Sequence, residues 1–364
     1  SRGVSAGRMA SWQRGVAPLV HAVEQRFDAL KYRLRWALGG PGPLHIEAYR
    51  GYGTPTALHL KGRVLEDRGI EPPGERESAW QNLRDMLKRV ASREFPNARV
   101  LARFRGIETE VQADEEGLFD LTLRLPEPLA EAGQWHPVEL ALLFPRLRGR
   151  QQPLAGEGQV LVPPRTARFG VISDIDDTVV QTNVTDVLRA ARTILLGSAR
   201  SRLPFHGVAT FYRALHAGLP GRPGNPLFFV SNSPWNLYDV LVEFLRLQGV
   251  PPGPLLLRNW GVSRHELLPT ESHGHKLAQI RPILATYPHL PFILVGDSGE
   301  EDPEIYAQVV AENRGRILAV YIRDVVPTTD PAIIRGLAQE VRAAGSSLIL
   351  APDTLAMAEH AAGQ

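Results

Sequence analysis

Three acids follow a short apolar run between Phe169 and Val180, where the sequence reads FGVISDIDDTVV. The apolar run predicts a β-strand that leads into Asp174, Asp176 and Asp177. Ligands of open α/β sheets bind beyond the carboxyl ends of the strands, so these carboxylates mark a candidate active site. The spacing Asp-x-Asp suits phosphoryl transfer, with Asp174 as the nucleophile, Asp176 as general acid and base, and a hard cation among the crowded carboxylates.

Two other interpretations of these acids fit the sequence less well. A calcium loop that begins at Asp174 needs Gly at its sixth position and Glu at its twelfth, but Val179 and Thr185 stand there. A receiver-type domain also gathers acids around a phosphorylated aspartate, although its early acids and that aspartate lie on different strands. Phosphoryl transfer is therefore the preferred interpretation.

A second polar strand end is predicted at Ser231 and Asn232. The sequence LFFVSNS from Leu227 to Ser233 places four apolar residues, typical of a buried parallel strand, before the polar ones. An amphipathic helix is expected to follow from Asn236 to Leu247, and a hydroxyl with backbone N–H groups at a helix N-terminus binds anions. Taken alone, a helix cap is the simpler explanation of these residues.

A third element is the sequence HGHK from His273 to Lys276, which precedes a helical spacing of apolar residues at Leu277, Ile280, Ile283 and Leu284. We expect Lys276 in the first turn of that helix, where a cation opposes the helix dipole. Neutralising phosphate together with Asp174 would explain this placement, whereas a surface lysine is the simpler interpretation of the residue alone. His273 and His275 lack a partner His or Cys at metal-ligand spacing.

The fourth element is the sequence FILVGDSGEEDPEI from Phe292 to Ile305, another apolar strand that ends in an acid. Asp297 would complete a magnesium site with Asp174 and the carbonyl of Asp176, and Asp302 would support these ligands. A single Gly-Asp-Ser-Gly turn would be ordinary. Four such elements in this order indicate a phosphoryl-transfer site.

These elements resemble the four motifs of the haloacid dehalogenase superfamily of phosphatases, which match at Asp174 to Thr178, at Ser231, at Lys276, and at Gly296 to Ser298 with Asp302. The strings SDIDDTV, FVSNSPWNLY, HGHK and GDSGEEDPEIY are similar to those of the actin-patch-associated phosphatidate phosphatase family and its bacterial relatives. The string RLPFHGVATFYRAL, between the first two, is similar as well. This resemblance covers about Phe169 to Asp324.

The resemblance implies a magnesium-dependent phosphomonoesterase in which Asp174 attacks phosphorus and forms an aspartyl phosphate. Asp176 would protonate the leaving alcohol and then activate the hydrolytic water. A lipid phosphate such as phosphatidate is the expected substrate. The resemblance also implies phosphoryl-oxygen contacts from Thr178, Ser231, Asn232 and Lys276, Mg²⁺ ligands from Asp174, Asp176 and Asp297, and support of these ligands by Ser298 and Asp302.

The patterns along the chain predict four segments. Residues 1–40 form a basic amphipathic helix, 41–145 an antiparallel β-sandwich accessory domain, 146–168 a linker with the strand that leads into the next domain, and 169–364 the haloacid-dehalogenase-like phosphatase domain. The last segment alternates strands and helices, which predicts an α/β fold with a doubly wound, Rossmann-like parallel sheet. Two short helices, Val184 to Leu196 and Val208 to Leu215, fit between Thr178 and Pro226, so a minimal cap is expected.

Composition limits the function further. The chain has 364 residues, 43% of them hydrophobic, and no cysteine, which excludes disulfides, thiolate metal sites and cysteine catalysis. No apolar run reaches the roughly 18 residues of a membrane span, and no secretory hydrophobic region is visible. A soluble, cytoplasmic protein is therefore expected.

The first 40 residues have a charge unlike that of the remainder. They carry seven Lys or Arg against Glu24 and Asp28, a net charge of +5, whereas the whole chain carries +2. A basic amphipathic helix can lie on an anionic membrane surface, which would place the protein peripherally at the membrane. Packing against the neighbouring domain is the plainer explanation.

Two alternative functions stay open. The same residues would serve a phosphatase for soluble or polynucleotide phosphomonoesters, although no nucleic-acid partner is expected because RNA-binding signatures and a basic aromatic platform are missing from the sequence. A non-catalytic lipid-binding or interaction module would have lost the acids, which are intact here. The β-sandwich is expected to act as a scaffold or to recruit a protein partner that the sequence does not name.

Overall fold

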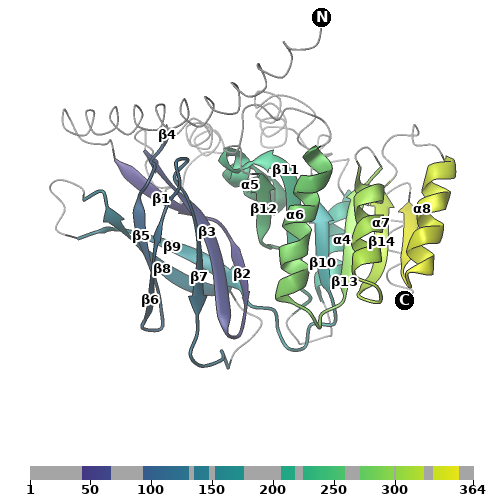
Figure 1. The fold of residues 1–364 in the computed structure, drawn as a ribbon, viewed down its shortest axis with the longest axis horizontal. Helices are drawn as coiled ribbons and strands as arrows, with labels where there is room; N and C mark the ends of the chain where they lie inside the picture. The colour runs from purple at the N-terminus through teal and green to yellow at the C-terminus, as the bar shows by residue number, and fades with distance from the viewer. Residues whose placement is uncertain are drawn as a thin grey trace, which may run out of the picture.

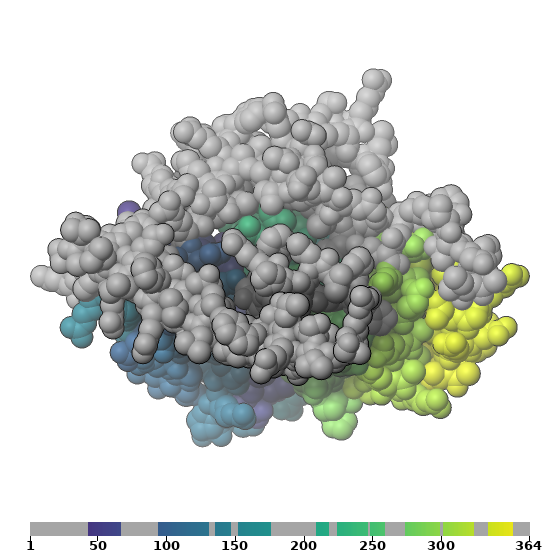
Figure 2. Space-filling view, turned by 45° about the horizontal axis from the view of Figure 1, so that its top comes forward, coloured from purple at the N-terminus to yellow at the C-terminus, as the bar shows by residue number. Residues whose placement is uncertain are grey.

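The computed structural model describes residues 43–66, 93–130, 135–146, 152–175, 206–217, 224–258, 271–298, 301–323 and 331–351. These residues form two β-sheets, one of nine strands and one of six. Figure 1 shows the nine-stranded sheet, mostly purple and blue, beside the six-stranded sheet and its helices. In the space-filling view of Figure 2, blue residues of the former and green to yellow residues of the latter lie at opposite ends. The predicted N-terminal helix lies outside the described residues, as does the predicted helix from Val184 to Leu196.

The nine-stranded sheet is built from β1 (Leu44–Ala48), β2 (Gly51–Thr54), β3 (Ala57–Glu66), β4 (Arg93–Glu94), β5 (Arg99–Phe104), β6 (Ile107–Gln112), β7 (Leu118–Arg124), β8 (Trp135–Phe144) and β9 (Leu154–Leu161). The long strand β3 pairs with β1 and β2 along one edge and with β7 and β4 along the other, and the sheet continues from β2 through β9, β8 and β5 to β6. Alternate side chains enclose one apolar core, which includes Leu60, Val100, Leu121 and Val138.

The predicted antiparallel β-sandwich differs from this sheet in two details. The pairs are antiparallel except that β2 and β9 run parallel, and the strands form one continuous hydrogen-bonded sheet rather than two separate sheets. Period-two alternation shows which face of a strand is buried but not which strands pair, so it does not predict these details. The strand expected near Val160 and Val162 is β9, which pairs with β8 and β2.

The six-stranded sheet is built from β10 (Gly170–Asp174), β11 (Leu227–Pro234), β12 (Leu255–Arg258), β13 (Phe292–Asp297), β14 (Ile317–Arg323) and β15 (Ser347–Ala351). Its order is β12-β11-β10-β13-β14-β15, and every pair is parallel, in agreement with the predicted α/β class. The direction of strand addition reverses between β10 and β13. Open α/β sheets bind their ligands at such a switch point.

Helices cover both faces of the parallel sheet (Figure 1). The described helices are α4 (His206–Ala217), η3 (Trp235–Leu237), α5 (Tyr238–Leu247), α6 (Glu271–Thr286), α7 (Asp302–Glu312) and α8 (Pro331–Ala343). Neighbouring residues of a strand point to opposite faces. Val171 of β10 accordingly packs in one apolar cluster with α4 and α5, and Ile172 packs in a second cluster with α6, α7 and α8.

Two helix starts differ from the prediction. Helix α6 begins at Glu271, so Lys276 lies in its second turn rather than its first. Strand β11 continues to Pro234, and α5 begins at Tyr238, after the short helix η3. The apolar spacing identifies the buried face of a helix but not its first residue. Within the described residues, no helix combines the length and the apolar character that a bilayer crossing requires.

Candidate active site

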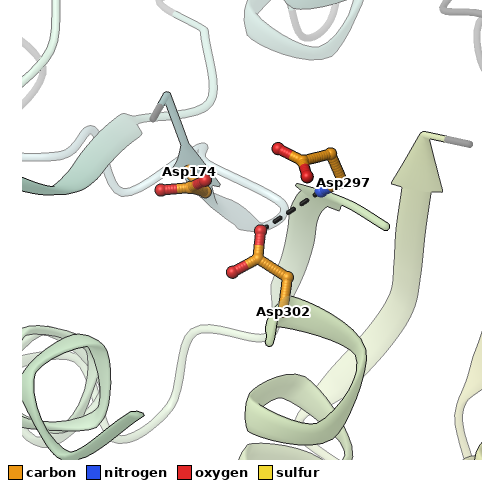
Figure 3. A group of neighbouring side chains, drawn as sticks. All are labelled: Asp174, Asp297 and Asp302. Carbon is orange, nitrogen blue, oxygen red and sulfur yellow. Dashed lines mark hydrogen bonds between the residues drawn. The ribbon is translucent and has the colours of Figure 1, made fainter. Parts of the chain in front are cut away.

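The predicted acids meet at the carboxyl ends of β10 and β13. These strands are neighbours, with Ser173 in register with Val295, so Asp174 and Asp297 lie at the same edge of the sheet. Asp302 begins α7, directly after this edge. Figure 3 shows the three carboxylates gathered there, and one oxygen of each lies within 4.8 Å of the others.

Lys276 reaches into this group from α6. Its Nζ lies 3.1 Å from Oδ2 of Asp174 and 2.6 Å from Oδ1 of Asp302, and the three side chains are at most 1% exposed. An ammonium that has lost its water needs compensating charge, which the two carboxylates supply. Lys276 is therefore an internal cation, and the interpretation as a surface lysine is wrong.

Asp302 connects the lysine to the neighbouring strand end. While Oδ1 receives Lys276, Oδ2 accepts the backbone N–H of Asp297 at 3.2 Å. Asp302 stands in the first turn of α7, where the helix dipole stabilises a carboxylate. One side chain thus orients both the internal cation and the residue that ends β13.

Gly296 gives Asp302 the space for this contact. A Cβ atom at position 296 would lie 2.3 Å from Oδ2 of Asp302 and 2.8 Å from Cε2 of Tyr306. The buried Tyr306 donates its hydroxyl to the carbonyl of Val295 at 2.8 Å, and burial raises the pKa of Tyr306 well above its usual value, so the phenol stays a donor. Glycine before Asp297 is a steric requirement of the site.

The charge of the group favours a cation. Asp174, Asp297 and Asp302 offer three carboxylates, and Lys276 offers one ammonium, so the ionised group carries an excess of negative charge in a buried place. Carboxylate oxygens suit a hard cation such as Mg²⁺. Asp174 and Asp297 fit the ligand role best, because both oxygens of Asp302 already contact Lys276 and the N–H of Asp297.

Ser231 lies on the strand on the other side of β10. Asp174 is in register with Val230, so Ser231 stands one residue beyond the level of Asp174. Ser231 is completely buried, its Oγ accepts the N–H of Ser233 at 2.9 Å, and its carbonyl accepts the amide of Gln279 at 2.9 Å. The half-buried Asn232 follows it on β11.

Sequence reasoning missed two side chains that hold the site. Gln279 lies three residues after Lys276, a spacing that places both on one helix face and that could have revealed it. Tyr212 of α4 contacts the hydroxyl of Ser173 at 2.5 Å, and Ser173 donates to the carbonyl of Asp174 at 3.0 Å. Burial raises the pKa of Tyr212 to about 12, so its hydroxyl stays protonated. No local pattern links Tyr212 to Ser173.

Of the four remaining predicted site residues, the described part of the chain includes Ser298. Asp176, Asp177 and Thr178 lie outside the described residues. Ser298 is buried directly after β13, and its backbone N–H donates to the carbonyl of Arg323 at 2.9 Å, which anchors the turn that follows the site.

Part of the chain is similar to a family of known proteins. Residues 169–324 match the family described as Phosphatidate phosphatase APP1, catalytic domain. Phosphatidate phosphatase APP1 of Saccharomyces cerevisiae is 36% identical over 156 residues, which are 43% of this chain and 26% of that protein. An uncharacterized protein of Schizosaccharomyces pombe is 31% identical over 160 residues, which are 43% of this chain and 25% of that protein. The chain thus matches about a quarter of the length of these relatives.

Solved structures are much less similar. A carbohydrate acetylesterase from Xanthomonas citri reaches a TM-score of only 0.23 at 13% identity, covering 80% of this chain and 72% of that chain. The family match, in contrast, contains the strands and helices that hold Asp174, Ser231, Lys276 and Asp297. Residues 169–324 of the chain are therefore similar to the phosphatidate phosphatase APP1 catalytic domain.

Proposed function

We propose that the chain is a magnesium-dependent phosphomonoester phosphatase of the haloacid dehalogenase type, which acts on phosphatidate or a related lipid phosphate. The observation that carries the proposal is the buried contact of Lys276 with Asp174 and Asp302, beside Asp297 at the switch point of the parallel sheet. This group lies within the segment that matches a family of phosphatidate phosphatase catalytic domains.

In the proposed reaction, a carboxylate oxygen of Asp174 attacks phosphorus, and the bond between phosphorus and the alcohol oxygen breaks. Asp176 donates a proton to that oxygen and later takes one from the water that hydrolyses the aspartyl phosphate. The ammonium of Lys276 balances charge on the phosphoryl oxygens, while its 3.1 Å contact with Oδ2 keeps Asp174 oriented. Thr178 and Ser231 are the proposed neutral contacts to the same oxygens.

The proposed magnesium ligands are Asp174, Asp297 and the backbone carbonyl of Asp176. When bound, Mg²⁺ supplies positive charge that offsets the carboxylates and the phosphoryl group. Asp302 holds the backbone of Asp297 and the ammonium of Lys276 in place. The N–H of Ser298 fixes the turn that follows.

Two observations support a lipid substrate. The Saccharomyces cerevisiae relative is named as a phosphatidate phosphatase, and residues 1–40 carry a net charge of +5. Basic segments are attracted to anionic lipid surfaces. The proposed enzyme therefore works from the cytoplasm, peripherally at the membrane in which its substrate lies.

The test measures phosphate release from phosphatidate in mixed micelles and from a soluble aryl phosphate, with Mg²⁺ or with a chelator. The parent protein is compared with Asp174→Asn and with Asp120→Asn, the same change at an acid whose side chain is 62% exposed on the nine-stranded sheet. We expect magnesium-dependent release from phosphatidate that falls by about 10⁴-fold or more in Asp174→Asn. Asp120→Asn should release phosphate at the parent rate.

Other outcomes would redirect the proposal. Release from the aryl phosphate alone would replace the lipid by a soluble or polynucleotide phosphomonoester. Release that survives the chelator would remove magnesium from the mechanism. Binding of phosphatidate without any release, equal in the parent and in Asp174→Asn, would overturn the enzyme and indicate a lipid-binding module.

A further inference from the structure

Residues 49–53, a short segment at the start of the nine-stranded sheet, contact the apolar clusters on both faces of the parallel sheet. Tyr49, in the turn between β1 and β2, is 1% exposed and packs in the apolar cluster of α4 and α5. Tyr52 of β2 packs against the opposite cluster, which includes α6. In Figure 1, β2 lies next to α6. The two sheets therefore share core contacts.

The first set of contacts holds the chain that follows Ser231. The ring of Tyr49 stacks on Trp235, with ring centroids 4.3 Å apart and 17° between the planes, and lies 4.5 Å from the ring of Tyr238. The backbone N–H of Arg50 donates to the hydroxyl of Tyr238 at 2.7 Å. Because η3 and α5 begin at these aromatic residues, the nine-stranded sheet fixes the exit from β11.

The second set holds the far end of the helix that carries Lys276. Tyr287 directly follows α6, and its hydroxyl donates to the carbonyl of Gly53 at 2.9 Å. Burial raises the pKa of Tyr287 well above its usual value, so the hydroxyl remains a donor. The ring of Tyr52 lies 6.3 Å from that of Tyr287 and meets Phe228 of β11 edge-on at 5.7 Å. The same short segment thus contacts both β11 and α6.

The segment that makes these contacts is closely held by its own sheet. A Cβ atom at Gly51 would lie 2.1 Å from the carbonyl oxygen of His59, and one at Gly53 would lie 2.3 Å from that of Ala57. Strand β2 therefore approaches β3 more closely than a larger residue permits. Such close packing restricts the movement of β2 and so fixes the residues that make the aromatic contacts.

We propose that Tyr49 is a positioning residue for the phosphatase site, which rests on the proposed function. Its ring, anchored on the nine-stranded sheet, holds Trp235 and the start of α5, so that Ser231 keeps its place beside Asp174. Loosening this contact weakens phosphate binding in the ground state and the transition state alike, which raises KM and leaves kcat nearly unchanged. The nine-stranded sheet then belongs to the scaffold of the site.

The test compares three variants of the full chain. Tyr49→Ala removes the stack on Trp235, and Tyr49→Phe retains the ring. Leu121→Ala is the matched control, because it truncates a buried residue in the separate core of the nine-stranded sheet. Each is assayed well below its melting temperature for kcat and KM with an aryl phosphate, and for competitive inhibition by inorganic phosphate.

We expect Tyr49→Ala to raise KM and the inhibition constant of phosphate by about tenfold, a misplacement effect of modest size. Tyr49→Phe should restore both values, and Leu121→Ala should lower the melting temperature without changing either. Equal phosphate inhibition in Tyr49→Ala and Leu121→Ala would overturn the positioning role. If Tyr49→Ala does not fold, the deciding variant is Tyr238→Phe, which removes the hydroxyl that accepts the Arg50 N–H. An unchanged inhibition constant of phosphate in this variant would overturn the proposal.

Failure of the proposed function would be recognised separately. In that case the parent protein releases no phosphate from any substrate, and calorimetric titration with inorganic phosphate replaces the kinetic assay. Weaker phosphate binding in Tyr49→Ala than in Leu121→Ala would then still support the positioning role. Equal binding in the two variants would overturn it.

Discussion

Two ion pairs of equal length, one on the nine-stranded sheet and one between helices of the parallel-sheet region, lie in opposite surroundings. On the nine-stranded sheet, Arg103 contacts Glu108 at 2.6 Å with side chains 51% and 53% exposed. Beside the parallel sheet, Lys276 contacts Asp302 at 2.6 Å with both side chains completely buried. Distance alone therefore does not indicate the role of a charge. Water screens the first pair, whereas the second acts in a place without that screening.

The difference contrasts charges at an exposed sheet edge with charges in the candidate active site. Strand β6 ends the order of its sheet, and charged side chains on an edge strand discourage pairing with other chains. The buried group has no such use, and its desolvation opposes folding. Buried charged groups that oppose folding are expected mainly at functional sites. This one lies at the switch point of the parallel sheet, where α/β folds bind their ligands.

Among the variants that test this comparison, replacement of the internal cation should give the largest effect. Lys276→Met leaves Asp174 and Asp302 as buried like charges, so we expect kcat to fall by about 10³-fold. In the presence of a chelator, the free energy of unfolding should fall by about 3–5 kcal/mol, measured by denaturant titration. The control is Lys61→Met, whose partner Asp120 lies 3.1 Å away and whose own side chain is 47% exposed; its change should stay below about 1 kcal/mol. Equal losses of stability in Lys276→Met and Lys61→Met would show that burial does not distinguish the two lysines.

The space around Asp302 can be tested with a single methyl group. Gly296→Ala would place Cβ 2.3 Å from Oδ2 of Asp302, so Asp302 must shift and kcat should fall by about 10²-fold. The control Gly336→Ala adds the same methyl group in α8, where it meets no atom within 4 Å beyond its chain neighbours and the backbone of its own helix. It should stabilise the protein by about 0.5–1 kcal/mol. Similar activity in both variants would show that the group tolerates displacement.

High pH tests the buried hydroxyl of Tyr212, which contacts Ser173 of β10. The folded pKa of Tyr212 is raised to about 12 by burial, so its contribution to stability is present below pH 10 and is lost as the pH rises towards 12. Above pH 10, this group alone should lower the free energy of unfolding by up to about 1.4 kcal/mol per pH unit. Denaturant titrations should therefore give a shallower decline for Tyr212→Phe; parallel curves would contradict the assignment.

The hydrogen bond to Ser231 should matter less than the charges. Gln279→Leu removes the amide donor at 2.9 Å from the Ser231 carbonyl, and we expect KM for an aryl phosphate to rise about tenfold. Gln308→Leu is the control, since its amide donates to the exposed Glu312 within the same helix, α7. Equal KM values in the two variants would exclude a role for Gln279 in holding the site.

The exposed pair should give the smallest effect. Arg103→Ala should change the free energy of unfolding by less than about 1 kcal/mol, and the change should shrink further in roughly 1 M salt, where charges are screened within about 3 Å. Denaturant titration at two salt concentrations measures both. A larger, salt-resistant loss would mean that exposure is a poor guide to the role of these charges.

The strand ends were the part of the site that the sequence could predict. Apolar runs before Asp174 and Asp297 mark two strands, and a parallel sheet brings the carboxyl ends of its strands to one edge. The contacts of Tyr212 and of Gln279 depend on packing between elements distant in the chain, which local periodicity does not contain. The start of α6 was missed because apolar spacing begins at Leu277, six residues after the helix does.

In the nine-stranded sheet, too, the sequence predicts the strands but not the contacts between distant residues. Alternating residues such as Leu58 and Leu60 predict strands with one buried face, and the structure has them in β3. The parallel pairing of β2 with β9 and the stacking of Tyr49 on Trp235 join residues far apart in sequence. Such pairings follow from how whole sheets pack, so no single segment encodes them.

The burial of Tyr49 in the core of the other sheet also bears on how the chain folds. The hydrogen bond from Arg50 to Tyr238 joins residues 188 positions apart, and contacts of such long range form slowly. During synthesis, the nine-stranded sheet can therefore complete its packing only after the chain has been made as far as Tyr238. Once made, this shared core ties the two sheets together, and heat should melt them in one cooperative transition.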